Sequence, residues 1–410
     1  MIPLRIGLDG RVLMQYEMRG FARYTVELFR AMKEIAGDHI ELYSFSPGPV
    51  APEFLAELEI EPVVFQARRE ILWEQVELPK HLRQTGIDVF HATANRGLPY
   101  SRVCKYVVTC HDIIDRLPEY CVGERWRGRW RKKYADFVSR QSAGKYITVS
   151  NFSKWDICRF HDLSPDRVVV IYNAAHRRFY EMLPAEQIAR VRNKYQLPPQ
   201  YFLFLGGFDK RKNVGGLVEA VARLSNDRTP NERLSDGCPS LVLAGEHKWD
   251  FAGVVQKISS LGLCQRVLCP GQIADADLPA LYQGALAFVN PSRYEGFGLQ
   301  LVEAMASGVP VLASETTSLP EVLDGSGLLF DPEDPDSIAE QMARIAGDPA
   351  LRNALAEKSR QRASFFSWHK AADQTLRVYL ELLGRSDDFL HARNQFGATS
   401  DAAAEPERQW

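Results

Sequence analysis

Short apolar runs alternate with longer segments of helical character along most of the chain. Nine such runs lie at 5–8, 41–45, 89–91, 106–109, 146–149, 202–205, 240–244, 287–289 and 309–313. Alternation of strands with helices favours parallel sheets that are covered by helices on both faces. The pattern therefore predicts an α/β protein with doubly wound domains, in which ligands bind at the carboxyl ends of the strands.

Breaks in this alternation predict the domain boundaries. The pattern pauses around 177–199, where Pro184, Pro198 and Pro199 occur, and a new series of strands begins at Phe202. The polar stretch 226–239 predicts a surface loop. We therefore expect an N-terminal domain, a second domain, a helix that crosses back to the first domain and a disordered tail, at 1–180, 181–370, 371–383 and 384–410.

Composition and charge exclude several classes of protein. The 410 residues suffice to bury two cores, and 50 basic against 52 acidic residues give a formal net charge of -2, which argues against a nucleic-acid-binding protein. The sequence has no run of about 18 apolar residues, so we expect no transmembrane helix. The first residues do not resemble a signal peptide. The seven cysteines include no Cys-x-x-Cys pair, so we expect neither a disulfide framework nor a zinc site. These features favour a cytoplasmic protein.

The segment 290–308 carries the strongest chemical signal. It follows a buried-type strand, two glycines allow a turn, and a helix is expected to begin near Leu299. Free backbone N–H groups at such a helix start favour a phosphate. Glu295 precedes the turn and Glu303 lies about one helical turn after it. Spacing alone leaves two interpretations open: two carboxylates that serve one ligand, or a loop glutamate and a capping or solvated helix glutamate.

Several motifs in the same order resemble one enzyme family. The segment 290–308 resembles the Glu-x7-Glu motif of the retaining family-four (group 1) glycosyltransferases with the GT-B fold. Further stretches that resemble this family lie at 149–153, 170–173, 204–213, 270–273, 277–278, 319–322 and 327–332. The resemblance covers about residues 5–383. It implies two facing Rossmann-like domains with a cleft between them, and a nucleotide-diphosphate sugar as donor.

The resemblance also implies roles for residues of the second domain. Glu303 would hold the ribose hydroxyls, and Glu295 would contact the transferred sugar. Lys212, together with Arg211, would neutralise the diphosphate as it leaves. Many family members carry an arginine at the place of Gly207, so Arg211 is expected to supply the second phosphate contact. The remaining donor-binding candidates are Gly296, Phe297, Gly298 and Leu299 for the sugar and diphosphate, and Gln272 and Ile273 for the base.

In the first domain the resemblance points to a histidine and a loop. His111 follows the run 106–109 and would lie beside the donor sugar; taken by itself, it is equally a histidine at a strand end. His91 carries the same ambiguity and is interpreted as structural or cleft-lining. The loop 18–24 resembles an acceptor-side loop in which a flexible glycine permits close approach to a substrate, and Gly20 and Arg23 are its candidates.

We predict a metal-independent mechanism with no cofactor. The Asp-x-Asp sequence of Asp275 and Asp277 falls in the expected base-binding turn and not beside the diphosphate. No residue is an evident covalent nucleophile, so the retention that the family implies points to front-face displacement. In that mechanism the leaving phosphate takes the proton of the acceptor, and the protein positions the substrates and stabilises charge.

A basic, aromatic cluster lies at 124–134. It contains six cations between Arg125 and Lys133, and Trp126 and Trp130 share a helix face because they are four residues apart. Tryptophan with lysine and arginine suits an anionic membrane surface. The alternative is a surface helix whose tryptophans pack on the core. The membrane-surface candidates are Arg125, Trp126, Arg129, Trp130 and Lys133.

Taken together, we expect a hexosyltransferase of surface polysaccharide synthesis, with mannose from GDP-mannose as the first choice. The acceptor would be a glycan or a lipid-linked glycan, and the protein would lie in the cytoplasm or peripherally on the inner face of the membrane. A rhamnosyl- or glucosyltransferase of the same fold is the alternative, and a non-catalytic sugar-nucleotide sensor is the alternative from another class. An epimerase or a glycan phosphorylase fits the motifs less well.

Overall fold

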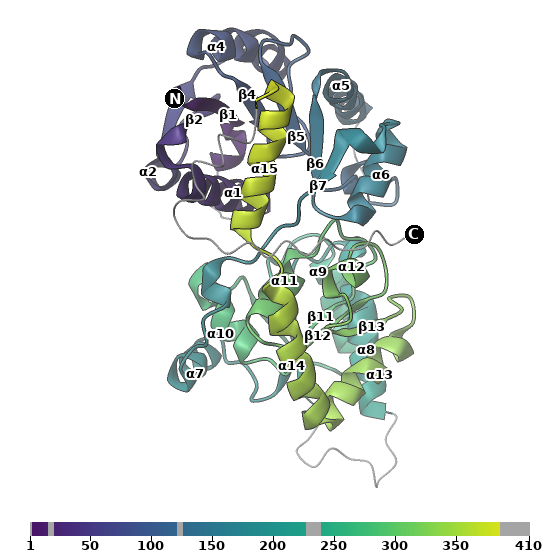
Figure 1. The fold of residues 1–410 in the computed structure, drawn as a ribbon. Coiled ribbons are helices and arrows are strands. Elements are labelled where there is room, and N and C mark those ends of the chain that lie inside the picture. The colour runs from purple at the N-terminus through teal and green to yellow at the C-terminus, as the bar shows by residue number, and fades with distance from the viewer. Residues whose placement is uncertain (1, 15–19, 121–125, 227–238, 386–410) are drawn as a thin grey trace.

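The computed structural model describes residues 2–14, 20–120, 126–226 and 239–385, and each of its two domains is built on one parallel sheet (Figure 1). Arg125, most of the predicted loop 226–239 and most of the predicted tail 384–410 lie outside the described residues. Within those residues, no helix is both long and apolar enough to cross a membrane. The five cysteines that are described are free thiols.

The N-terminal sheet has seven strands in the order β3-β2-β1-β4-β5-β6-β7. The strands are β1 (Leu4–Asp9), β2 (Ile40–Ser46), β3 (Ile60–Val64), β4 (Val89–Ala92), β5 (Lys105–Thr109), β6 (Lys145–Thr148) and β7 (Val168–Val170). All neighbours are parallel; for example, Ile6 pairs with Leu42 on one side of β1 and with Val89 on the other. This doubly wound order leaves the carboxyl ends of the strands at one edge of the sheet.

The C-terminal sheet has six parallel strands in the order β10-β9-β8-β11-β12-β13. The strands are β8 (Tyr201–Leu205), β9 (Ser240–Ala244), β10 (Val267–Gly271), β11 (Ala287–Asn290), β12 (Val311–Ser314) and β13 (Leu328–Phe330). Strand order reverses between β8 and β11, and such a switch point is where ligands bind in open parallel sheets. The predicted α/β class with two doubly wound domains is confirmed.

Helices connect the strands and cover the faces of both sheets (Figure 1). In the first domain they are α1 (Phe21–Ala36), α2 (Pro52–Leu58), α3 (Glu70–Leu72), α4 (Leu78–Thr85), α5 (Trp126–Ser142) and α6 (Asn151–His161). From the linker onward they are α7 (Ala185–Lys194), α8 (Val214–Asn226), α9 (Phe251–Ser260), α10 (Leu278–Gln283), α11 (Leu299–Ala306), α12 (Leu319–Leu323), α13 (Pro335–Gly347), α14 (Pro349–Ala363) and α15 (Trp368–Leu383). Helix α7 lies within 177–199, where the pattern of the sequence pauses.

The last helix ties the end of the chain to the first domain. Helix α15, yellow in Figure 1, leaves the C-terminal domain and packs along α1. Its Tyr379 hydroxyl lies 2.6 Å from Nδ1 of His91, and Nε2 of His91 lies 2.7 Å from Oγ1 of Thr109. Burial lowers the pKa of His91 to about 3, so the ring is neutral. His91 is therefore a structural residue of the β4–β5–α15 contact.

Candidate functional site

The predicted site residues converge on a hollow of about 600 Å³ at the carboxyl ends of the C-terminal strands. The N-terminal domain contributes Gly20 and Arg23 to its wall. The C-terminal domain contributes four more predicted residues, Gln272, Ile273, Leu299 and Glu303. Residues 250 positions apart in the sequence therefore face one another across the same space.

A buried cluster of opposite charges lies beside this hollow. Nζ of Lys212 is 2.5 Å from Oε1 of Glu295, and the Arg211 guanidinium is 3.0 Å from Oε2 of the same carboxylate. The Ser292 hydroxyl donates to Oε1 at 2.7 Å. Burial alone would raise the pKa of Glu295, but Lys212 and Arg211 outweigh it and lower that pKa to about 2. Glu295 is thus an anion that is held by two cations. The same two cations can bind the negative charge of a ligand.

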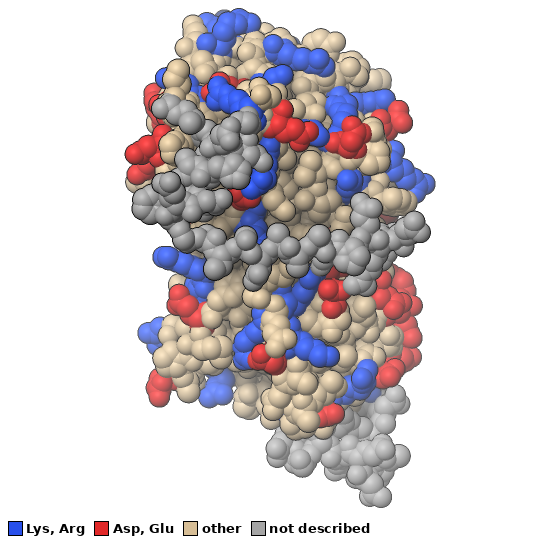
Figure 2. Space-filling model, in the orientation of Figure 1, with Lys and Arg blue, Asp and Glu red and all other residues tan. Residues whose placement is uncertain are grey.

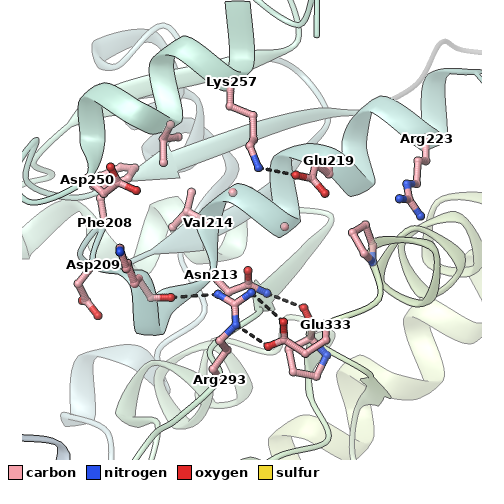
Figure 3. Close-up of a pocket in the computed structure, with 16 residues that line it drawn as sticks. Phe208, Asp209, Asn213, Val214, Glu219, Arg223, Asp250, Lys257, Arg293 and Glu333 are labelled. Carbon is pink, nitrogen blue, oxygen red and sulfur yellow. Dashed lines mark hydrogen bonds and ion pairs between the residues drawn. The ribbon is translucent and has the colours of Figure 1, made fainter. Parts of the chain in front are cut away.

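The Arg293 side chain, which Figure 3 shows paired with Glu333, holds the turn that carries Lys212. The Arg293 guanidinium donates to the Lys210 carbonyl at 3.1 Å and pairs with Glu333, while the backbone N–H of Arg293 donates to the Arg211 carbonyl at 2.8 Å. These bonds join the loop after β8 to the loop after β11. Arg293 lies within the segment 290–308, but the motif of that segment predicts no role for it.

A second hollow, of about 350 Å³, is lined in part by Lys210, Arg293 and Glu333. Figure 3 shows its wall, where Lys257 pairs with Glu219 and Arg293 pairs with Glu333. The Asn213 amide donates to the Pro332 carbonyl at 2.6 Å in the same region. Charges of both signs in this wall are paired with each other, so these side chains join α9 to α8 and the loop after β11 to the loop after β13.

Two glycines shape the turn before α11. Gly298 has a φ of 85°, a left-handed conformation that favours glycine. At Gly296, a Cβ would lie 2.5 Å from the His111 carbonyl oxygen, so only glycine lets this turn touch the other domain. Helix α11 begins at Leu299 as predicted, and its first N–H groups have no partner within the helix. Phe297 is buried beneath this turn.

His111 is held as a neutral ring at the boundary between the domains. Burial lowers its pKa to about 4. Its Nε2 lies 3.0 Å from the Thr93 carbonyl, and Tyr24 and Phe21 contact its ring. A carbonyl only accepts hydrogen bonds, so the proton is on Nε2 and Nδ1 is the acceptor nitrogen. His111 can therefore accept a hydrogen bond from a sugar hydroxyl.

Glu303 is buried and already has two partners. The Tyr282 hydroxyl donates to Oε2 at 3.1 Å, and the Arg23 guanidinium donates to Oε1 at 2.8 Å. Burial raises the pKa of Glu303, and Arg23 opposes that shift. Arg23 also pairs with Asp275. The structure thus places Arg23 against the predicted ribose carboxylate, which differs from the acceptor-side position expected for it, because the first turn of α1 faces the second domain.

The two carboxylates of the Asp-x-Asp sequence face cations. Asp275 accepts from Arg178 at 2.5 Å as well as from Arg23. Asp277 accepts from Lys194 at 2.6 Å and from the Tyr195 hydroxyl at 2.8 Å. They fix the turn that carries Gln272 and Ile273 to the linker and to α7. Tyr282 and Arg178 are site residues that sequence reasoning missed, because no local motif marks them.

Helix α6 connects the two domains at the site. Ser150 and Ser153 donate to the Gly296 carbonyl at 2.7 and 2.9 Å, and Ser153 also lies 3.1 Å from the His111 carbonyl. On the other side, Glu321 accepts from the backbone N–H of Asn151 at 2.8 Å. The Tyr172 hydroxyl also donates to Glu321 at 2.8 Å, so the stretches 149–153, 170–173 and 319–322 meet here.

The basic, aromatic cluster lies on α5, away from this cleft. Trp130 is 66% exposed and Lys133 lies 5.8 Å above its ring, so the alternative in which this tryptophan packs on the core is wrong. Arg129 is also exposed. The side chains of Arg125 and Trp126 are not among those that the structure describes. Figure 2 shows that Lys and Arg alternate with Asp and Glu over the visible face, in keeping with a net charge near zero.

Comparison with known proteins gives consistent matches over both domains. Residues 18–177 match the family model "Glycosyltransferase Family 4", and residues 186–362 match "Glycosyl transferases group 1". The O-antigen chain mannosyltransferase B of Escherichia coli is 32% identical over 387 residues, which cover 89% of this chain and 97% of that protein. The serotype-specific mannosyltransferase WbdA of Escherichia coli is 29% identical over 76% of this chain and 38% of its own length. A solved structure of Anabaena HepE in complex with UDP and glucose superposes with a TM-score of 0.70 at 18% identity, covering 92% of this chain and all of that one.

Proposed function

The chain belongs to the family 4 glycosyltransferases and has their GT-B fold, and from this premise we propose that it transfers mannose from GDP-mannose, with retention, to a glycan or lipid-linked acceptor. The observation that carries the proposal is the buried cluster of Lys212, Arg211 and Glu295, which lies beside the hollow that Glu303 lines. Mannose is chosen because the two relatives described above are named as mannosyltransferases.

The charge cluster suits a sugar diphosphate. Lys212 and Arg211 face a carboxylate in this structure, and a diphosphate offers them more negative charge in the same place. When they turn to the diphosphate, Glu295 is released to accept hydrogen bonds from the sugar hydroxyls. Glu303 would accept from the ribose in the same way, in exchange for its bond from Arg23.

The reaction would then proceed on one face of the sugar. The bond from the anomeric carbon to the diphosphate breaks as the acceptor oxygen bonds to that carbon, and the leaving phosphate oxygen takes the acceptor's proton. The two cations stabilise the leaving charge, so we propose that turnover needs no divalent metal. His111 would hold a sugar hydroxyl through Nδ1, and contact between the domains excludes water.

The experiment is a donor panel with the purified chain. GDP-mannose, dTDP-rhamnose and UDP-glucose are each offered with a mannose-terminated oligosaccharide, and release of the nucleoside diphosphate is followed with and without EDTA. We expect release from GDP-mannose only, unchanged by EDTA, and an α-linked product by NMR. Release from another donor alone supports the rhamnosyl or glucosyl alternative. Binding of a donor with no release from any of them supports the sensor.

We also propose that the protein lies peripherally on an anionic membrane surface. The exposed indole of Trp130, with Lys133 over its ring and further cations on α5, has the composition of an interfacial helix. A lipid-linked acceptor would lie at the same surface.

A further inference from the structure

One large aromatic side chain in the donor hollow has no role in the mechanism above. Trp249 lies in the loop between β9 and α9 and lines the hollow together with Gly207, Gln272 and Ile273. Its side chain is 67% exposed, although it stands next to buried strands. An exposed indole at the wall of a ligand pocket offers a flat apolar face without the cost of first displacing a neighbour.

The backbone holds this indole in an unusual conformation. Trp249 has a φ of 56°, in the left-handed region that bulky residues rarely adopt. Two backbone bonds fix it: the N–H of Lys248 donates to the Glu246 carbonyl at 2.8 Å, and the N–H of Asp250 donates to the Phe208 carbonyl at 3.3 Å. Rarely populated backbone conformations of this kind gather at ligand-binding sites.

Gly207 provides the space for the ring. A Cβ at position 207 would lie 2.7 Å from Cζ3 of Trp249 and 3.2 Å from Cε3, closer than side chains pack. The indole therefore occupies the volume that a side chain at 207 would fill. The family resemblance predicts an arginine at position 207, but this chain has a glycine there. The contact explains the difference, because the Trp249 ring fills the space that a side chain at 207 would need.

The same hollow also has a polar part and further apolar surface. Glu303, Arg23 and Asp275 line it as a connected polar group, and Ile273 and Leu278 add apolar side chains. A ribose bound at Glu303 would leave its base in a hollow whose wall includes Gln272, Ile273 and the indole of Trp249. Base–aromatic stacking needs only the π-face of a base, and its strength grows with the overlapping area.

We propose that Trp249 is the stacking face for the donor's nucleobase and that it makes the site prefer a purine to a pyrimidine. This inference rests on the proposed nucleotide-sugar donor and deepens it, because it assigns the base selectivity to one side chain. A bicyclic base covers more of the indole than a monocyclic one, whereas the ribose and diphosphate contacts are common to both. The selectivity should therefore disappear with the ring, and the common contacts should remain.

Calorimetric titration with GDP and with UDP tests the proposal without any transfer reaction. The wild-type chain should bind GDP more tightly than UDP. Trp249→Ala should weaken GDP binding by about tenfold and UDP binding by less than threefold, and Trp249→Phe should lose less than Trp249→Ala. Trp155→Ala, which removes another exposed tryptophan, on α6, is the matched control and should bind both nucleotides as the wild type does.

A second variant tests whether the loss of binding comes from the position of the indole and not from another effect of the substitution at Trp249. Gly207→Ala should push the indole aside and reproduce the loss of GDP binding, while the double variant Gly207→Ala/Trp249→Ala should lose no more than Trp249→Ala alone. GDP should quench tryptophan fluorescence in the wild type and less in Trp249→Phe. Thermal unfolding of every variant confirms that it is folded.

Three results overturn the inference: wild-type affinity for GDP in Trp249→Ala, equal losses for GDP and UDP in that variant, or a wild type that prefers UDP. The first two leave the proposed transfer of mannose standing, since the enzyme would still bind GDP through its ribose and diphosphate. The proposed function fails separately, when wild-type protein binds GDP but releases none from GDP-mannose.

Discussion

Lys212 and its partner Glu295 form the ion pair on which the proposed chemistry depends. If the lysine stabilises the departing diphosphate, Lys212→Ala should lower kcat/KM by about 100-fold to 1,000-fold, as the loss of one such donor does elsewhere. Arg211 remains on Glu295, so the carboxylate keeps a cation and the variant should fold. Initial rates of GDP release from GDP-mannose measure the effect.

Lys210, two residues earlier in the same turn, provides the matched control. Its side chain is exposed, and Lys210→Ala removes a positive charge of the same kind. Turnover should stay within twofold of the wild type. Lys212→Met/Glu295→Gln, which removes both charges and keeps the volume, should be folded and as inactive as Lys212→Ala. Wild-type turnover in Lys212→Ala would contradict the assignment of the diphosphate.

Buried His91 makes the stability of the protein depend on pH. Its pKa is lowered to about 3 in the folded chain by burial, with a smaller contribution from His111, and an unfolded histidine has a pKa near 6.5. Below pH 6.5 the unfolded chain therefore binds a proton at this position that the folded chain does not. The contribution of His91 to the free energy of unfolding therefore has its full value above pH 6.5 and decreases as the pH falls below that value.

This loss can be measured as a difference between two proteins. From pH 7.5 to 5.5, the stability advantage of the wild type over His91→Gln should shrink by about 1.4 kcal/mol, since one pH unit below the unfolded pKa corresponds to that energy. Urea unfolding at both pH values gives the figure. An advantage that stays constant would show that His91 is protonated in the folded state.

At the residue scale, local motifs identified the charged residues but not their partners. Glu295 and Lys212 follow strands, and Glu303 lies about one turn into the helix that comes next, so their place at the carboxyl edge could be predicted from the sequence. Arg293, Tyr282 and Trp249 could not, because each acts through a contact between separate segments that only the packed domain brings together. Arg23 was assigned to another part of the site for the same reason.

At the scale of elements, α6 shows how one helix serves both domains. Its N-cap Ser150 accepts from the Ser153 N–H at 2.9 Å, an ordinary local cap. Glu321 of α12 accepts from the N–H groups of Asn151 and Phe152 at the same helix start, and from the Tyr172 hydroxyl at 2.8 Å. The second domain thus supplies a carboxylate to the positive end of a helix in the first.

We predict that Glu321→Gln weakens the contact between the domains. Loss of the anion at the helix start should cost about 1 kcal/mol, which lowers the melting temperature by about 2 °C. If the closed arrangement of the domains is the active one, kcat/KM for transfer should fall about fivefold, because about 1 kcal/mol changes the equilibrium between closed and open arrangements by that factor. Glu315→Gln, an exposed carboxylate of the same domain, is the control. Lower stability with unchanged transfer would separate the contact from catalysis.

The strands that the sequence predicted and those it missed differ in burial. All nine apolar runs form strands, while β3, β7, β10 and β13 were not predicted. These four are the two edges of each sheet, and each buries one residue. A central parallel strand is covered on both faces and becomes continuously apolar, whereas an edge strand has a weaker signal. Helix α7, which is mostly exposed, was missed for a related reason.

At the scale of the whole molecule, alternation predicted two doubly wound domains but not how they meet. The bond between Arg23 and Glu303 joins residues 280 positions apart, and the path of α15 along α1 depends on packing that no periodicity encodes. The family resemblance supplied the facing arrangement and the cleft. The net charge of -2 likewise conceals the separation of a cationic donor site from the basic surface of α5.

That basic surface leads to a prediction for the molecule as a whole, namely its partition between water and membrane. Wild-type protein should float with vesicles that contain anionic lipid and remain below vesicles of neutral lipid alone, with binding that weakens as salt rises. Trp130→Ala should reduce the bound fraction because the indole would enter the interface, while Trp155→Ala, equally a loss of an exposed tryptophan, should not. Soluble GDP-mannose turnover should be the same in all three proteins, since α5 lies away from the cleft. Absence of flotation even at low salt, or an equal loss of bound protein in the two variants, would contradict the proposed membrane binding. The proposed transfer reaction would not be affected by either result.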